Sequence, residues 1–435
     1  MRKRKRPTVR RLVESTRKED SLPHSSTDPA TVSAPPTENA TALAAADIAP
    51  ALGVALWMGA AYFPIAQGLL SGPSDYTHHV EFTQLFLDKG ILYSPACLLH
   101  LVAAALVRCG LAASSHDAIL AVAVGGYAAL GAALCLCARR LLPALSGGWR
   151  RLLPALIAIV VPLIQPATSW GSSYTIGYIW AEPYFSPTYA LLKPFAVITA
   201  MFAACFLTES KRVPWMALSF CAVCVAAVTL AKPSFTICAL PAIGVLSARN
   251  WFRKTPFSKT GVFYAWLLPA SAVLVWQLNR TYASPGGLGH YTDTIVFAPL
   301  AVMRIHSSGL LAKYLLSVLF PLSVLALFRK RAWNDAGLRF SVVAFAFGTV
   351  YAYSLGERVQ LASGNFLWCA YITLFLLYFF AAVFVVKQLT DPVPATADTR
   401  MVALACLGVL AWQLAIGISV HLTVFQTVRA NAGYG

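Results

Sequence analysis

Long apolar runs separated by short polar loops make up this chain from about residue 50 to residue 421. Several runs reach roughly 18 residues or more, which is enough to cross about 30 Å of hydrocarbon as a helix. Because lipid offers no water to unpaired backbone groups, the pattern predicts an all-α fold, a polytopic transmembrane helical bundle. We expect about 11 spans, at residues 50–70, 117–138, 152–166, 188–207, 213–230, 233–248, 260–278, 311–328, 338–355, 366–386 and 401–421.

Two stretches between the first and second spans break this pattern. In residues 71–90, apolar side chains between positions 80 and 86 are spaced for one helical face, which is typical of a helix lying along a membrane surface. The stretch 91–107 is apolar but short. If it crossed the membrane, four later basic loops would fall on the wrong side, so we interpret it as a second outer-face or re-entrant helix.

Lysine and arginine clusters between the apolar runs predict how each run is oriented. The clusters are residues 2–18, 139–140 with 150–151, 211–212, 249–259, 329–331, Lys387 and Arg400. Short loops rich in these residues stay in the cytoplasm. We therefore expect a multi-pass membrane protein with its N-terminus in the cytoplasm and its C-terminus on the outer face; the resemblances described below imply a bacterial inner (plasma) membrane, with that C-terminus periplasmic.

Composition divides the chain into two parts. Residues 1–48 begin with a basic head and continue as a polar stretch, so we expect them to form a disordered cytoplasmic tail. Residues 49–435 are expected to form one transmembrane helical domain. Only 12% of the residues are charged, and the net charge of +17 comes from the tail and the cytoplasmic loops. We interpret these cations as topology signals that attract membrane lipid, and expect no nucleic acid partner.

The first outer loop, residues 71–116, holds the candidates for catalysis. Asp75, His78, His79 and Glu81 lie within one short stretch, and spacings of three or four residues place side chains on one helical face. A carboxylate beside a histidine can act as a general base or bind a metal. We take Asp75, His79 and Glu81 as the catalytic candidates. The structural alternative is that Ser74 or Asp75 caps the helix and that Glu81 is merely solvated.

The later outer loops, residues 167–187, 279–310 and 356–365, and the helix ends beside them hold candidates for substrate binding. Aromatic residues there either anchor the membrane interface or contact sugar rings. Cations at the edge of the hydrocarbon either extend to the surface or hold a phosphate. The candidates are Trp180, Glu182, Tyr184, Lys193, Lys232, His290, Glu357 and Arg358.

These features together resemble the GT-C glycosyltransferases, integral membrane enzymes that use polyprenyl-phosphate-linked sugars. The resemblance covers roughly residues 50–386: an acid in the first outer loop, two flanking surface helices and ten or more spans. It implies that Asp75 is the catalytic acid or base. Tyr76 and Thr77 follow Asp75 where some members have a second acid, so no cofactor is assigned and a divalent metal stays open. The strings SDYTHHVEF and LAKPSF also resemble bacterial multi-pass membrane proteins of unassigned activity.

Two functions follow as hypotheses. In the first, the protein is an inverting glycosyltransferase that moves a sugar from a polyprenyl-phosphate donor to an envelope glycan, lipid or protein acceptor on the outer face. In the second, it is a multi-pass transporter or flippase of lipid-linked envelope precursors. Transporters place ionisable residues near the middle of the membrane, whereas the ionisable residues here gather at the outer ends of spans, which favours the enzyme.

Overall fold

The computed structural model describes residues 45–166, 178–179, 184, 186–208, 213–283, 294–359, 361–390 and 397–431. Most of the predicted tail 1–48 lies outside these ranges, although the first helix already begins at Ala45. Trp180, Glu182 and His290, three of the substrate-binding candidates, also lie outside the described residues.

Helices make up almost all of the described structure, which confirms the all-α prediction. The α-helices are α1 (Ala45–Leu70), α2 (Asp75–Lys89), α3 (Leu98–Arg108), α4 (Ser115–Leu141), α5 (Trp149–Val160), α6 (Pro187–Phe206), α7 (Trp215–Ala231), α8 (Ser234–Phe252), α9 (Leu268–Leu278), α10 (Ala301–His306), α11 (Leu310–Ser317), α12 (Leu319–Phe328), α13 (Lys330–Asn334), α14 (Ala336–Ser354), α15 (Leu367–Thr390) and α16 (Ala397–Asn431). Short 3-10 or π segments are η1 (Val161–Leu163), η2 (Gly261–Leu267), η3 (Asn279–Ala283) and η4 (Leu361–Ser363), and strands β1 (Ile295–Phe297) and β2 (Leu355–Glu357) pair antiparallel.

Eight helices in the described part of the chain are long and apolar enough to cross a membrane. A ninth span results if α11 and α12, which are bent by 67° at their junction, are counted as one. This count is lower than the predicted number of about 11 spans because it leaves out α5, with 12 residues, and α7, with 17 residues, which is at the lower end of the length that crosses a membrane.

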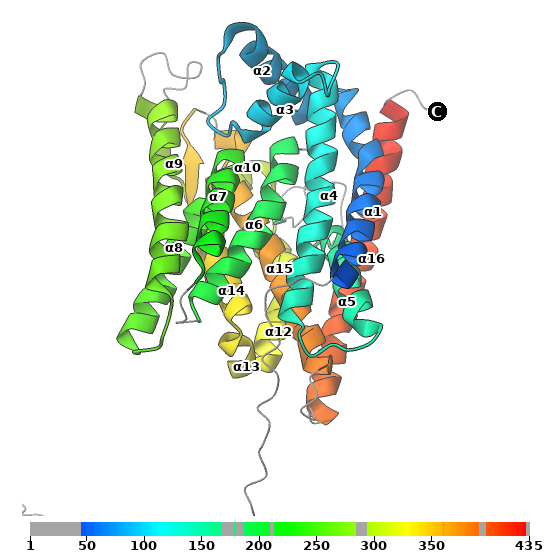
Figure 1. Ribbon diagram of the computed structural model, residues 1–435, viewed down its shortest axis with the longest axis vertical. Coiled ribbons are helices and arrows are strands. Elements are labelled where there is room, and N and C mark those ends of the chain that lie inside the picture. Colours follow the sequence, from blue (N-terminus) through cyan, green and yellow to red (C-terminus); the bar gives the residue numbers. More distant parts are fainter. Residues whose placement is uncertain are drawn as a thin grey trace, which may run out of the picture. The chain divides into compact units, whose positions relative to one another are not determined.

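The bundle has two distinct ends (Figure 1). Helices α2 and α3 lie at one end, the α2 end, whereas the α4–α5, α8–η2 and α12–α13 connections lie at the other, the basic end. The basic end takes its name from the Lys and Arg residues of these connections. Helix α3 has only 11 residues, or about 16 Å of helix, so it is too short to cross a membrane by itself. This length agrees with the interpretation of 91–107 as a non-crossing segment.

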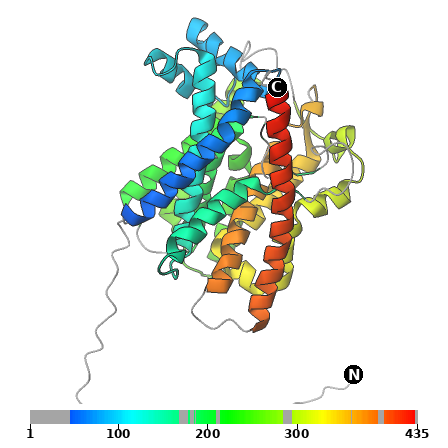
Figure 2. The same ribbon diagram turned by 90° about the vertical axis from the view of Figure 1, so that its right-hand side faces the viewer.

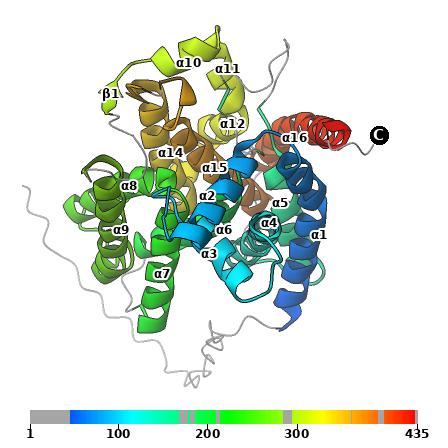
Figure 3. The same cartoon turned by 90° about the horizontal axis from the view of Figure 1, so that it is seen from above.

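Helices α6 and α15 lie near the middle of the bundle, and α16 lies along its outside next to α1 (Figures 2 and 3). In its most apolar stretch, the span that contains α15 has 94% of its residues buried, against 28% for α16. The central helices are packed closely through glycines. A Cβ at Gly126 of α4 would lie 3.0 Å from the carbonyl of Ala190 in α6, and one at Gly348 of α14 would lie 2.7 Å from the carbonyl oxygen of Cys369 in α15. Glycines at these crossings therefore fix the positions of α6 and α15.

Buried polar side chains form hydrogen bonds with the backbone at the break between α11 and α12. The Gln413 amide donates a hydrogen bond to the Leu316 carbonyl at 3.0 Å. The Tyr378 hydroxyl donates to the Ser317 carbonyl at 2.8 Å and lies 3.0 Å from the Gln413 side-chain oxygen. Carbonyls that a helix break would leave exposed are thus already satisfied from α15 and α16.

Candidate functional site

Helix α2 begins with a cap that does not involve the Asp75 side chain. Ser74 is the N-cap residue: its side-chain oxygen accepts a hydrogen bond from the Tyr76 backbone N–H, and Thr77 completes a capping box with it. Asp75 is the first residue of the helix. Of the structural alternatives, capping therefore belongs to Ser74, which leaves the carboxylate of Asp75 available for other contacts.

Asp75 pairs with His79, one helical turn further on. The two are joined by a contact of 3.6 Å from the His79 Nε2 to the Asp75 Oδ2, and His79 is buried, with 8% of its surface exposed. His78 points away and lies 3.8 Å from Glu81, with side chains 67% and 70% exposed. Of the three catalytic candidates, the structure thus brings Asp75 and His79 together and leaves Glu81 at the surface.

A second histidine, which the sequence did not single out for catalysis, extends this pair into the protein. His100 of α3 is fully buried, and its Nε2 lies 3.2 Å from the Nδ1 of His79. Its Nδ1 lies 3.0 Å from the hydroxyl oxygen of Thr83, which in turn lies 2.9 Å from the His79 carbonyl. Asp75, His79, His100 and Thr83 therefore form one connected polar chain across α2 and α3.

The direction of these hydrogen bonds follows from what each group can do. A carbonyl only accepts, so the Thr83 hydroxyl donates to His79 and must accept from the Nδ1–H of His100. A neutral His100 then accepts at Nε2, and His79 donates to it from Nδ1. This assignment leaves the Nε2 of His79 facing the Asp75 carboxylate, at 3.6 Å from its Oδ2.

Asp75 also lies close to a lysine from a distant part of the chain. Burial raises the pKa of Asp75, but hydrogen bonding and charge from His79, the charge of Lys232 and the hydroxyl of Ser186 together lower it below its usual value. Ser186 precedes the first turn of α6, and α2 packs against α6. Three separate elements, α2, the start of α6 and the α7–α8 turn, thus surround one ionised carboxylate.

Lys232 lies in the tight turn between α7 and α8. Its ammonium lies 3.5 Å from the centre of the Trp368 ring, at the start of α15. Burial lowers the pKa of Lys232 to about 8, and the charge of Asp75 opposes this shift. A cation held on an indole face next to a carboxylate is positioned for an anionic group such as a phosphate.

Lys193 belongs to α6 and is fully buried. Its ammonium lies 4.5 Å from the Tyr189 ring centre, 5.2 Å from Phe375 and 5.6 Å from Tyr127. Tyr189 also packs on Trp368, with 5.3 Å between ring centres. Lys193 and Lys232 are therefore connected through one pair of aromatic rings.

The remaining described candidates make contacts of other kinds. The Tyr184 hydroxyl lies 3.2 Å from the Nδ1 of His421, and its ring packs on Tyr62, which stacks on Tyr127 beside Lys193. Glu357 ends β2 and accepts a hydrogen bond from the Asn365 amide. Arg358 is exposed, and its backbone N–H donates to the Thr294 carbonyl.

No group of three or more metal-binding side chains occurs within the described residues. Comparison with protein-family models, with curated proteins and with solved structures finds no match to this chain.

The buried position of His100 predicts an acid-sensitive fold. Burial, followed by the nearby His79, lowers the pKa of His100 to about 3 in the folded protein, from an ordinary value of 6.5. Between these values the unfolded chain binds a proton that the folded protein does not. Stability is therefore lost as the pH falls below 6.5, by about 2 kcal/mol on reaching pH 5.

Thermal unfolding in detergent at pH 7 and pH 5 tests this expectation. The change in unfolding free energy should be clearly smaller in His100→Asn, which keeps a donor and an acceptor but cannot titrate in this range. Asp75 does not confuse the comparison, because its lowered pKa confines its own effect to more acidic pH. Equal acid sensitivity in both proteins would contradict the assignment of a neutral, buried His100.

Proposed function

We propose that this protein transfers a sugar from a lipid-linked phosphate donor of the polyprenyl-phosphate type to a hydroxyl of an envelope glycan, lipid or protein. The observation that carries the proposal is the Asp75 carboxylate, which contacts His79 at 3.6 Å and lies near enough to Lys232 for each charge to influence the other. A base can accept the proton of the acceptor hydroxyl, and a cation near it can stabilise the charge of the leaving phosphate.

The proposed step is a single displacement. Asp75, supported by His79, takes the proton from the acceptor hydroxyl while the oxygen of that hydroxyl attacks the anomeric carbon of the sugar. The bond from that carbon to the phosphate oxygen breaks, and its electron pair stays on the lipid phosphate next to the Lys232 ammonium. Attack from the side opposite the leaving group inverts the anomeric carbon.

A specific feature of the bundle weighs against transport. Transporters use broken helices whose free backbone groups bind the substrate or an ion. The break between α11 and α12 is of this kind, but Gln413 and Tyr378 already occupy the carbonyls of Leu316 and Ser317. Asp75, the carboxylate that contacts His79, lies instead at the α2 end, on a helix that precedes the second span.

The proposal includes an orientation: the α2 end and the C-terminus face the periplasm, and the basic end and the N-terminus face the cytoplasm of a bacterial inner membrane. The basic connections at the end opposite α2 support it. A reporter inserted after residue 145 or 255 should then read cytoplasmic, and one near residue 80 should read external. An external reading at 145 would contradict this orientation.

The direct test is an enzyme assay with purified full-length protein in lipid nanodiscs. It is supplied with radiolabelled sugars on polyprenyl phosphate and with membrane extract as the acceptor source. We expect label to move to the acceptor and lipid phosphate to accumulate in equal amounts. Movement of intact donor between leaflets without any release of lipid phosphate would support the transporter instead.

A further inference from the structure

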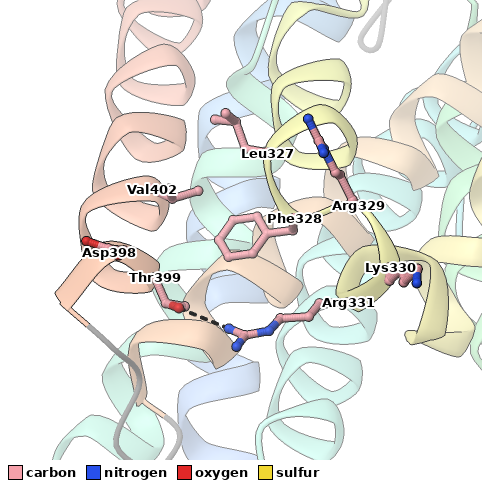
Figure 4. A pocket seen from close by; sticks show the side chains of 8 residues that line it. All are labelled: Leu327, Phe328, Arg329, Lys330, Arg331, Asp398, Thr399 and Val402. Atoms are coloured by element: carbon pink, nitrogen blue, oxygen red, sulfur yellow. Dashed lines mark hydrogen bonds between the residues drawn. The ribbon is translucent and has the colours of Figure 1, made fainter.

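A pocket at the basic end lies far along the bundle from Asp75. It has a volume of about 460 Å³ and lies between the α12–α13 turn and the first turn of α16 (Figure 4). Three consecutive cations, Arg329, Lys330 and Arg331, line it, and all three are exposed. The mechanism proposed above uses none of them.

The pocket lies where an apolar surface meets these charges. Leu327 and Val402 line it, and Leu327 is 52% exposed. On α16 next to it, Met401 and Leu404 are 66% and 54% exposed. In a membrane bundle such side chains face lipid tails, so a basic pocket at their edge is at the depth of the lipid head groups.

A hydrogen bond joins two of the residues that line the pocket. The Arg331 guanidinium donates to the hydroxyl of the buried Thr399 at 3.0 Å (Figure 4). Asp398 also lines the pocket, so its three cations outnumber its one acid and the lining keeps a net positive charge. That charge attracts an anionic group such as a phosphodiester.

The backbone at the turn is strained. Arg329 has φ 42° and ψ −111°, a conformation that favours glycine over residues with a side chain. Strained residues of this kind gather at ligand sites, where the chain tolerates the cost because of the side chain that it positions. An arginine at this turn starts the run of three cations at the mouth of the pocket.

We propose that this pocket binds the head group of an anionic phospholipid, with its phosphate on Lys330 and Arg331 and its acyl chains on the apolar flank of α12 and α16. The rival explanation is a general attraction of any basic loop to anionic lipid. The rival predicts that cations elsewhere at the basic end matter equally. Arg253 and Lys254, at the end of α8, are exposed too and provide the matched control.

The test is lipid binding to detergent-purified full-length protein, measured by native mass spectrometry. The probes are dioleoyl-phosphatidylglycerol and dioleoyl-phosphatidylcholine, with inorganic phosphate as a soluble competitor. We expect tighter binding of phosphatidylglycerol, weakened about 30-fold in the double variant Lys330→Gln with Arg331→Gln. The control double variant, Arg253→Gln with Lys254→Gln, should change it by less than about twofold.

Equal losses in the two double variants would overturn the proposal in favour of general attraction. No loss in either variant would overturn it as well. Displacement of the lipid by millimolar inorganic phosphate would identify a soluble anion as the ligand. Because all the substituted side chains are exposed, thermal unfolding should show that both variants remain folded.

Discussion

Replacing Asp75 by Asn is expected to abolish sugar transfer while the protein still inserts and accumulates normally. Loss of a general base costs about 10²–10⁴ in rate. The amide of Asn has nearly the size of the carboxyl group but cannot accept the proton of the acceptor hydroxyl. Because Ser74 rather than Asp75 caps α2, the start of the helix is retained in the variant. The measurement is release of lipid phosphate by the variant in nanodiscs, with its amount in membranes determined in parallel.

Two exposed neighbours on α2 serve as matched controls for this experiment. Glu81→Gln also replaces a carboxylate by an amide, six residues further on. His78→Gln is the control for His79→Gln, because His78 is the adjacent histidine that faces solvent. Both should keep full activity, whereas His79→Gln should lose most of it. Full activity in Asp75→Asn would remove Asp75 from the mechanism, and equal losses in all four variants would point to a damaged α2.

The fold was largely predictable from the sequence because the hydrophobic thickness of a membrane sets a minimum length for each apolar run. The predicted number of spans and the count of long apolar helices differ at α5 and α7, which are apolar but have only 12 and 17 residues. Proline residues, loop contacts and packing decide where such a helix ends. None of these can be weighed from hydropathy alone.

The candidate site was predictable where a charged residue stood out against apolar neighbours. Lys193 and Lys232 are of this kind, whereas Asp75 was indicated by its place among the polar residues of the first outer loop. His100 is an ordinary polar interruption in a short apolar run, and Trp368 is one aromatic residue among many. Their roles come from contacts across the fold, His100 with His79 and Trp368 with Lys232, and a single sequence contains no information on such distances.

The choice between the two adjacent histidines illustrates the same limit. His78 and His79 are three and four residues after Asp75, and either spacing allows a contact on a helix. Burial against α3 decides the outcome, because it turns His79 inward to His100 and leaves His78 in solvent. The periodicity of α2 alone could not show which face would be covered.

Replacing Lys232 by Met is expected to lower the rate of transfer about 10²–10³-fold, the usual cost of losing a group that stabilises developing charge. Methionine keeps an unbranched side chain of similar length, and its sulfur packs well on aromatic rings. If Lys232 only supported Trp368, Lys232→Met would therefore retain activity. Lys232→Arg keeps the cation and should recover part of the lost rate. Lys259→Met removes a lysine that lies 4.2 Å from the Trp251 ring outside the site, and should change nothing.

The pH dependence of kcat/KM separates the charge of Lys232 from its bulk. Because the pKa of Lys232 is lowered to about 8, its ammonium loses a proton as the pH rises through that value. The rate on free enzyme and donor should then fall above about pH 8, since a neutral amine cannot stabilise the leaving phosphate. In Lys232→Arg this fall should disappear, because a guanidinium stays charged well above that pH. A decline near pH 8 that persists in the arginine variant would mean that another group titrates, and Lys232 would lose its place beside the phosphate.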